Sequence, residues 1–152
     1  MPLLQYVYFA LFSRHTSADD MTSQLGITPD EVTVRGSRFT EPAVVPVEHS
    51  WMVVCREPGL RVDEQITRIL DRLQPHTDRI CDLTGHLARN GGGAVLQIVR
   101  YFNDTDQAHP GAADAANLFG WHLDRKVLDF LNATGSELDI DEYDMAGAED
   151  TR

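Results

Sequence analysis

Cysteine is scarce in this chain, and its two cysteines are not placed like metal ligands or redox partners. Cys55 and Cys81 lie far apart, without a Cys-x-x-Cys or Cys/His spacing. Cys55 falls in a strand-like run and Cys81 on the apolar side of an expected helix, so we expect both to be small buried hydrophobic side chains. Unpaired thiols are typical of a reducing compartment.

Long hydrophobic runs are also absent. No stretch approaches the roughly 20 apolar residues that a membrane-spanning helix needs. The apolar start, Leu3 to Phe12, has no basic residue before it and no small-residue cleavage site after it, and Arg14 and His15 follow directly. We therefore expect a soluble, cytoplasmic protein without a signal peptide.

The sequence lacks the motifs that carry common chemistry. It has no Gly-x-Ser-x-Gly, and its six histidines form no His-x-His or His-Glu-x-x-His. Residues 90–93 (Asn-Gly-Gly-Gly) lead from an expected helix into an expected strand, the reverse of a phosphate-binding loop. The acids of residues 139–144 lack the glycine and spacing of an EF-hand, which favours a solvated strand face. No catalytic residue, metal ligand or cofactor is predicted.

Positively charged residues are also few. Thirteen Lys and Arg residues oppose 24 Asp and Glu, a formal net charge of −11, and residues 101–152 hold 12 of the acids and only 3 of the bases. Such a field repels phosphate backbones and anionic membranes, so nucleic-acid and membrane binding are disfavoured. It serves solubility, and it would suit a basic protein partner.

What the chain does have is the composition of one globular domain. Its 152 residues are 42% hydrophobic and 24% charged, and a domain of this size buries about 70% of the surface of its unfolded chain. We expect a single domain over residues 1–145, followed by an acidic flexible tail over residues 146–152.

Tyr6–Phe12 is the most apolar stretch, seven apolar or aromatic residues without a charge. Such a run predicts a central strand buried on both faces, with its aromatic side chains in the core. Further strands are expected at residues 31–35, 50–55, 94–102, 118–123 and 136–143. The last of these alternates, with Leu138 and Ile140 on one face and acids on the other.

Helices are predicted from apolar spacing and from capping residues. A short helix follows Ser17 and ends at Gly26. A two-part helix covers residues 62–74 and 76–88, divided at Pro75. Asp124 begins the last helix, which Gly135 ends, with its inward side chains expected to be Val127, Leu128 and Leu131.

The predicted order of elements is β-α-β-β-α-β followed by β-α-β. It favours an α+β fold, a ferredoxin-like βαββαβ sheet with helices packed on it, extended by a C-terminal βαβ module. The connection at residues 37–49 holds two prolines and is expected to be flexible at Arg38 to Glu41. Residues 103–117 are expected to form a disordered surface loop.

Five residues are candidate ligand-binding positions. Arg35, Arg38 and His49 flank the proline-rich connection and could form a polar site. Trp121 and His122 follow Gly120, which would let a ligand approach the backbone. Core packing is the simpler interpretation for a tryptophan in a strand-like run, and it is the one expected of Trp51.

The order of these features resembles a known family. An aromatic strand precedes a short helix that closes as Leu-Gly-Ile-Thr-Pro at residues 25–29, followed by Arg35-Gly36. Ser50-Trp51 then opens a strand before the two-part helix, and the end has a short helix, Gly135 and an acidic strand closing on residues 141–143. Over residues 5–144 this is similar to domain of unknown function 4279. The resemblance implies a small bacterial α+β protein and no catalytic residues.

Three functions stay open from the sequence. The first is a non-enzymatic domain that binds a protein or a small-molecule ligand, and it fits best with the missing motifs. The second is an immunity protein that neutralises a basic toxin, since an acidic surface speeds association with a basic partner. The third is an enzyme whose site is assembled from loops. The oligomeric state is open, with a homodimer as one alternative.

Overall fold

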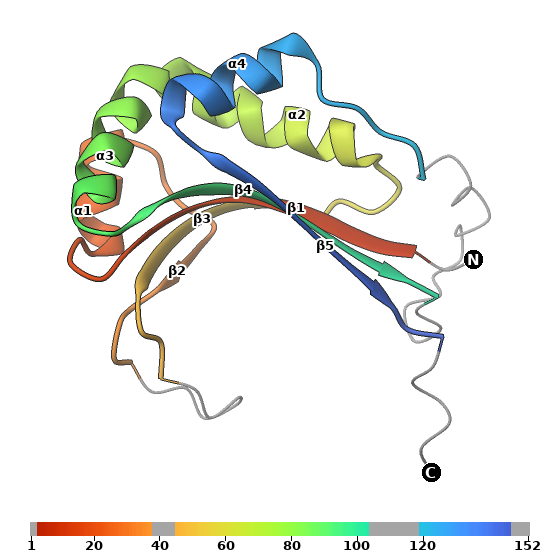
Figure 1. The fold of residues 1–152 in the computed structure, drawn as a ribbon, viewed down its shortest axis with the longest axis horizontal. Coiled ribbons are helices and arrows are strands. Elements are labelled where there is room, and N and C mark those ends of the chain that lie inside the picture. The colour runs from red at the N-terminus through yellow and green to blue at the C-terminus, as the bar shows by residue number, and fades with distance from the viewer. Residues whose placement is uncertain (1–2, 38–44, 104–118, 147–152) are drawn as a thin grey trace.

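Helices cover one face of a single five-stranded sheet in this protein (Figure 1). The computed structural model describes residues 3–37, 45–103 and 119–146. The elements, in chain order, are β1 (Leu3–Ser13), α1 (Ala18–Leu25), β2 (Glu31–Thr33), β3 (His49–Cys55), α2 (Val62–Leu73), the 3₁₀ turn η1 (Gln74–His76), α3 (Thr77–Arg89), β4 (Gly93–Phe102), α4 (Arg125–Thr134) and β5 (Glu137–Asp144). The α+β class is as predicted.

The sheet has the strand order β2-β3-β1-β4-β5. β1 is antiparallel to both β3 and β4, β2 is antiparallel to β3, and β5 is parallel to β4. A ferredoxin-like sheet has four antiparallel strands, whereas this sheet has five and is mixed, because β5 is parallel to β4. The ferredoxin-like arrangement is therefore not confirmed. The strand predicted at residues 118–123 is wrong for its described part, because residues 119–123 pair with no strand and Trp121 and Leu123 instead pack on the core from a loop.

β1 is central, as predicted, but the described helices cover only one of its faces. Val7, Phe9 and Leu11 are fully buried against the helices, whereas Tyr6 and Tyr8 point to the other face and are only half-buried. Figure 1 shows the sheet arched, with the four α-helices on its convex side. The other face, which we call the open face, carries no helix among the described residues. The expectation that all the aromatic side chains of this strand lie in the core is therefore wrong.

Capping residues fix the helix ends where the sequence predicts them. The Ser17 hydroxyl accepts a hydrogen bond from the Asp20 N–H, and an Asp124 carboxylate oxygen accepts one from the Val127 N–H. Gly26 and Gly135 end α1 and α4 with φ of 71° and 63°. Such left-handed conformations cost glycine nothing, since it has no Cβ.

Two side chains lie on a different helix face from the one predicted. α4 buries Phe130 beside Val127 and Leu131, while Leu128 is 48% exposed. Cys81 is exposed, because the buried face of α3 runs through Ile80 and one further residue turns about 100° away from it. Cys55 is buried as predicted.

The core lies between the helices and the convex face of the sheet. Trp51 is its largest side chain, fully buried as predicted, with its Nε1 donating a hydrogen bond to the Thr22 hydroxyl at 3.1 Å. The predicted flexibility at Arg38 to Glu41, nearly all of the predicted loop at residues 103–117 and nearly all of the predicted tail lie outside the described residues.

Candidate functional site

Arg35 and His49 lie together at one end of the sheet. The Arg35 N–H donates a hydrogen bond to His49 Nδ1 at 3.0 Å, and the Arg35 guanidinium donates one to the Arg14 carbonyl at 3.1 Å. His49 also pairs with Ser13 at the C-terminal end of β1. The pair therefore links the β2–β3 connection to the loop after β1. Arg38, the third predicted member, lies outside the described residues.

Trp121 and His122 lie at the start of α2. An Asp63 carboxylate oxygen accepts hydrogen bonds from the His122 N–H at 3.2 Å and from the Arg61 guanidinium at 2.9 Å, and His122 Nδ1 lies 3.5 Å from it. The His122 side chain is exposed, and Trp121 is partly buried against the core. A shallow depression of about 300 Å³ lies beside these groups.

The two groups of predicted residues do not converge. Arg35 and His49 lie beside Ser13, at the end of β1. α2 begins near the other end, where the Gln5 side chain donates a hydrogen bond to the Leu60 carbonyl at 2.8 Å. Eight residues of strand separate Gln5 from Ser13, roughly 25 Å at the usual rise per residue. A ligand role for either group stays a prediction, but no small ligand can contact both.

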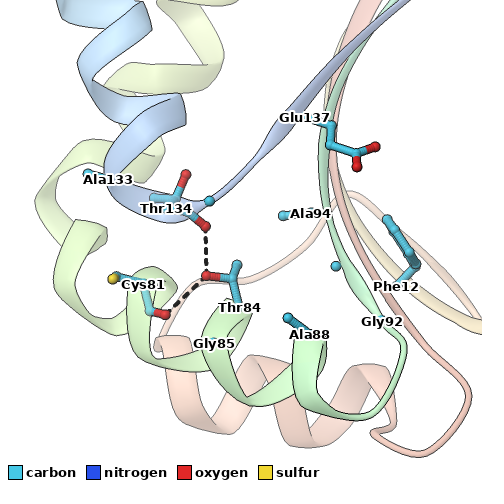
Figure 2. Close-up of a pocket in the computed structure, with 12 residues that line it drawn as sticks. Phe12, Cys81, Thr84, Gly85, Ala88, Gly92, Ala94, Ala133, Thr134 and Glu137 are labelled. Atoms are coloured by element: carbon cyan, nitrogen blue, oxygen red, sulfur yellow. Dashed lines mark hydrogen bonds between the residues drawn. The ribbon is translucent and has the colours of Figure 1, made fainter.

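A cleft of about 370 Å³ opens where the ends of α3 and α4 meet the start of β4 (Figure 2). Most of its lining is glycine and alanine. The Thr84 hydroxyl, 2.7 Å from the Thr134 carbonyl and 3.0 Å from the Cys81 carbonyl, uses its proton within the protein. Figure 2 shows the Glu137 carboxylate directed away from Thr84. This cleft is best interpreted as the seam between two helices.

A buried arginine lies on the helix-covered side of the sheet. Arg100 is 4% exposed, and burial holds the pKa of its guanidinium below the ordinary value. Its Nε donates to the Gln5 side chain at 3.1 Å, and its Nη1 lies 3.4 Å from a carboxylate oxygen of Glu142. Arginine is almost never buried without such partners. Its contacts join β1, β4 and β5, which indicates a structural role.

The open face gathers every tyrosine of the chain. The sequence holds four tyrosines, and because facing residues of neighbouring strands project on the same side, Tyr6, Tyr8, Tyr101 and Tyr143 share this face. Tyr6 and Tyr8 stack with ring centroids 6.2 Å apart, and Tyr101 and Tyr143 stack at 5.1 Å. Arg56 lies over the Tyr6 ring, 4.8 Å from its centroid.

Carboxylates flank these rings. Burial raises the pKa of the Tyr8 phenol, and the negative charges of Asp141 and Asp139 raise it further, which places both carboxylates near the ring. Asp141 accepts a hydrogen bond from the Gln97 amide at 3.1 Å. At the other side of the face, Glu31 pairs with Arg56 at 2.6 Å. Burial also raises the pKa of Tyr6, with Tyr101 as the next cause.

Tyrosine rings and carboxylates together suit cations. A ring face attracts an ammonium or guanidinium group, and a carboxylate adds a charge-assisted hydrogen bond. The described residues contain no group of three His, Cys, Asp or Glu side chains placed to hold a metal ion. The arrangement can therefore contact an ammonium or a guanidinium group.

Reasoning from the sequence missed the tyrosines, although a signal was present. Tyr6 and Tyr8 alternate with Val7 and Phe9, and tyrosine differs from phenylalanine in carrying a hydroxyl that needs water or a partner. A strand whose alternate positions are tyrosines can therefore have one wet face. The contribution of Tyr143 depends on the register of β5 with β4, which no single segment shows.

Comparison with known proteins gives a family and no activity. No helix in the described part of the chain is long and apolar enough to cross a membrane. No curated protein and no solved structure matches the chain. The family described as "Domain of unknown function (DUF4279)" matches residues 4–145, nearly the whole length. The chain therefore belongs to the DUF4279 family.

Proposed function

We propose that this protein is a non-enzymatic binding domain whose open face holds a basic segment of another protein. One observation carries the proposal: all four tyrosines share a sheet face with Asp139 and Asp141, and no described helix covers that face. Tyrosine is enriched at binding surfaces because it combines a large apolar ring with a polar tip.

The charge of the face selects the partner. β5 carries five acidic residues among its eight and no basic one. Each contact of a lysine or arginine with an exposed ring contributes about 0.5–1 kcal/mol, and a carboxylate beside the ring adds to it. An acidic segment would instead meet like charge, and so would a phosphate. A protein segment rich in lysine and arginine is thus favoured over an anionic ligand.

Neutralisation of a basic toxin is a specific form of this proposal. The acids of β5 concentrate negative charge on one side of the sheet, and complementary charge speeds the encounter of two proteins. A toxin encoded beside this protein would be the partner. Co-expression with that toxin should restore bacterial growth, and the variant with Asp139→Asn and Asp141→Asn should restore less. No rescue by the unaltered protein would exclude this form.

A displayed library of random peptides tests the general proposal. We expect the peptides retained by the protein to be enriched in lysine and arginine, and their affinity, measured by fluorescence anisotropy, to fall about tenfold in the variant with Asp139→Asn and Asp141→Asn. Asparagine keeps the shape and an acceptor oxygen, so the hydrogen bonds from Gln97 and from the Ile140 N–H can remain.

A matched control separates this site from general charge. Asp71 and Asp82 are exposed on the helices, on the other side of the sheet, and replacing both by asparagine changes the net charge equally. That variant should bind as the unaltered protein does. Equal losses in the two variants, or retained peptides without excess basic residues, would contradict the proposal.

A further inference from the structure

β5 forms one edge of the sheet. Among the described residues its only strand neighbour is β4, so the backbone groups on its outer side form no hydrogen bonds with another strand. The opposite edge, β2, has only three residues, whereas β5 has eight. An exposed strand of that length can accept a further strand.

The hydrogen bonds show which residues face outward. The Met145 N–H donates to the Phe102 carbonyl at 2.8 Å, so odd-numbered residues here point their backbone groups toward β4. The Ile140 N–H instead bonds to the Asp139 side chain at 3.1 Å. Because backbone groups alternate in direction along a strand, Leu138, Ile140 and Glu142 present theirs at the free edge.

The side chains of β5 specify what a further strand should contain. Leu138 and Ile140, 39% and 41% exposed, lie on the helix-covered side of the sheet. Asp139 and Asp141 lie on the open face, beside Tyr8. Residues of an added strand would pair with these on the same face. The added strand should therefore carry apolar side chains on the helix-covered side of the sheet and basic side chains on the open face.

A second copy of β5 does not meet this requirement. Antiparallel pairing of two β5 strands would place acids opposite acids on the open face, and like charges directly opposite each other destabilise a strand pair. Acidic side chains also protect an edge from its own kind. The same charges favour a basic strand.

We propose that β5 captures its partner by strand addition, and that the captured segment alternates lysine or arginine with aliphatic residues. This inference rests on the proposed function and specifies the conformation and the residue pattern of the partner segment. Three outward residues, Leu138, Ile140 and Glu142, supply the backbone contacts, and Asp139 and Asp141 select the basic side chains. Asp139 releases the Ile140 N–H as its carboxylate turns to the incoming cation.

A labelled eight-residue peptide that alternates lysine with valine is the probe, with fluorescence anisotropy as the measurement. Backbone N-methylation removes a donor, and a strand bound at an edge uses the donors of alternate residues only. Methylating one set, the lysines or the valines, should weaken binding about tenfold or more, and methylating the other set should not. A sensitive valine set indicates antiparallel addition and a sensitive lysine set parallel addition.

A variant of the protein tests the same backbone hydrogen bonds with the peptide unchanged. Ile140→Pro removes an outward N–H and leaves the ladder with β4 intact, as proline is tolerated at an edge whose N–H faces solvent. We expect it to weaken peptide binding about tenfold, and Leu128→Val, at an exposed position of α4, to leave binding unchanged. If Ile140→Pro lowers folding stability, the methylated peptides still decide.

The outcomes separate the two proposals. Loss of binding in the variant with Asp139→Asn and Asp141→Asn, together with equal effects of the two methylated sets, would overturn strand addition and support the proposed function alone. An Ile140→Pro variant that binds the peptide normally would likewise overturn strand addition. Failure of the alternating peptide, with retention of other basic peptides, would also overturn strand addition. If no basic peptide binds, both proposals fail.

Discussion

Tyr6 and Tyr8 on the open face have raised pKa values, so their phenols ionise less readily than tyrosine in water. Burial is the first cause of the raised pKa of Tyr8, and Asp141 and Asp139 add to it because a phenolate beside them would be a third negative charge. The neutral phenol is therefore the form that the fold favours. Its hydroxyl can donate a hydrogen bond to a partner over the whole physiological pH range.

Tyr8→Phe should make the protein less sensitive to alkali. A raised pKa stabilises the folded state fully below the ordinary tyrosine value of about 10, and that contribution is lost as the pH rises through the higher folded value. The free energy of unfolding, measured with urea over a series of alkaline pH values, should thus fall less steeply in Tyr8→Phe than in the unaltered protein. An equal pH dependence in the two proteins would contradict the raised pKa of Tyr8.

Gly92 lies where a side chain has no room. A Cβ there would clash with the Phe12 carbonyl oxygen, which belongs to the backbone of the central strand. We expect Gly92→Ala to lower the free energy of unfolding by about 1–3 kcal/mol, the usual cost of overpacking. Gly85→Ala is the control, because that helical position has open space. It should raise stability by up to about 1 kcal/mol. Urea denaturation measures both.

At the scale of elements, α4 depends on the capping residue that precedes it. Asp124 accepts the Val127 N–H at 3.0 Å, and the helix it begins packs Phe130 against Phe9 with ring centroids 5.8 Å apart. Asp124→Ala should lower the free energy of unfolding by about 1 kcal/mol, the typical value of such a cap. Asp129→Ala, exposed in the same helix, should change it by less than about 0.5 kcal/mol. An equal effect of both variants would argue against the cap.

Local rules predict these helices well. Ser17, Gly26, Asp124 and Gly135 begin and end their helices as the sequence indicates, because a cap acts on backbone groups three or four residues away. The two-part helix likewise follows from Pro75. Such features need no knowledge of the rest of the chain, and that is why they could be predicted.

Features set by distant segments were not predictable in the same way. The number of covered faces of β1 depends on where the helices pack. The apolar run at Tyr6–Phe12 alone suggested two covered faces, whereas the described helices cover one. Residues 119–123 are apolar enough for a strand, yet β5 takes the place beside β4. The candidate site shares this property, since Tyr8 and Asp139 lie in one row across the sheet only through the register of β1, β4 and β5.

At the scale of the whole molecule, negative charge exceeds positive by 11, and repulsion within that excess opposes folding. Salt screens repulsion and attraction alike. The described ion pairs, such as Arg56–Glu31 and Arg72–Asp30, are largely exposed, and exposed pairs contribute about 0–1 kcal/mol each. Four of the five acids of β5 form no described ion pair. Repulsion among such acids should therefore be the larger of the two effects that salt removes.

Raising the sodium chloride concentration from about 0.01 M to about 0.15 M shortens the Debye length from about 30 Å to about 8 Å. We expect the urea midpoint to rise across this range, and to rise less in the variant with Asp139→Asn and Asp141→Asn, because two of the repelling charges are then absent. The variant with Asp71→Asn and Asp82→Asn has the same net charge but keeps the acids of β5, so its salt dependence should stay nearer that of the unaltered protein. A midpoint that falls with salt would show that the ion pairs outweigh the repulsion, and that the acids of β5 do not destabilise the fold by repelling one another.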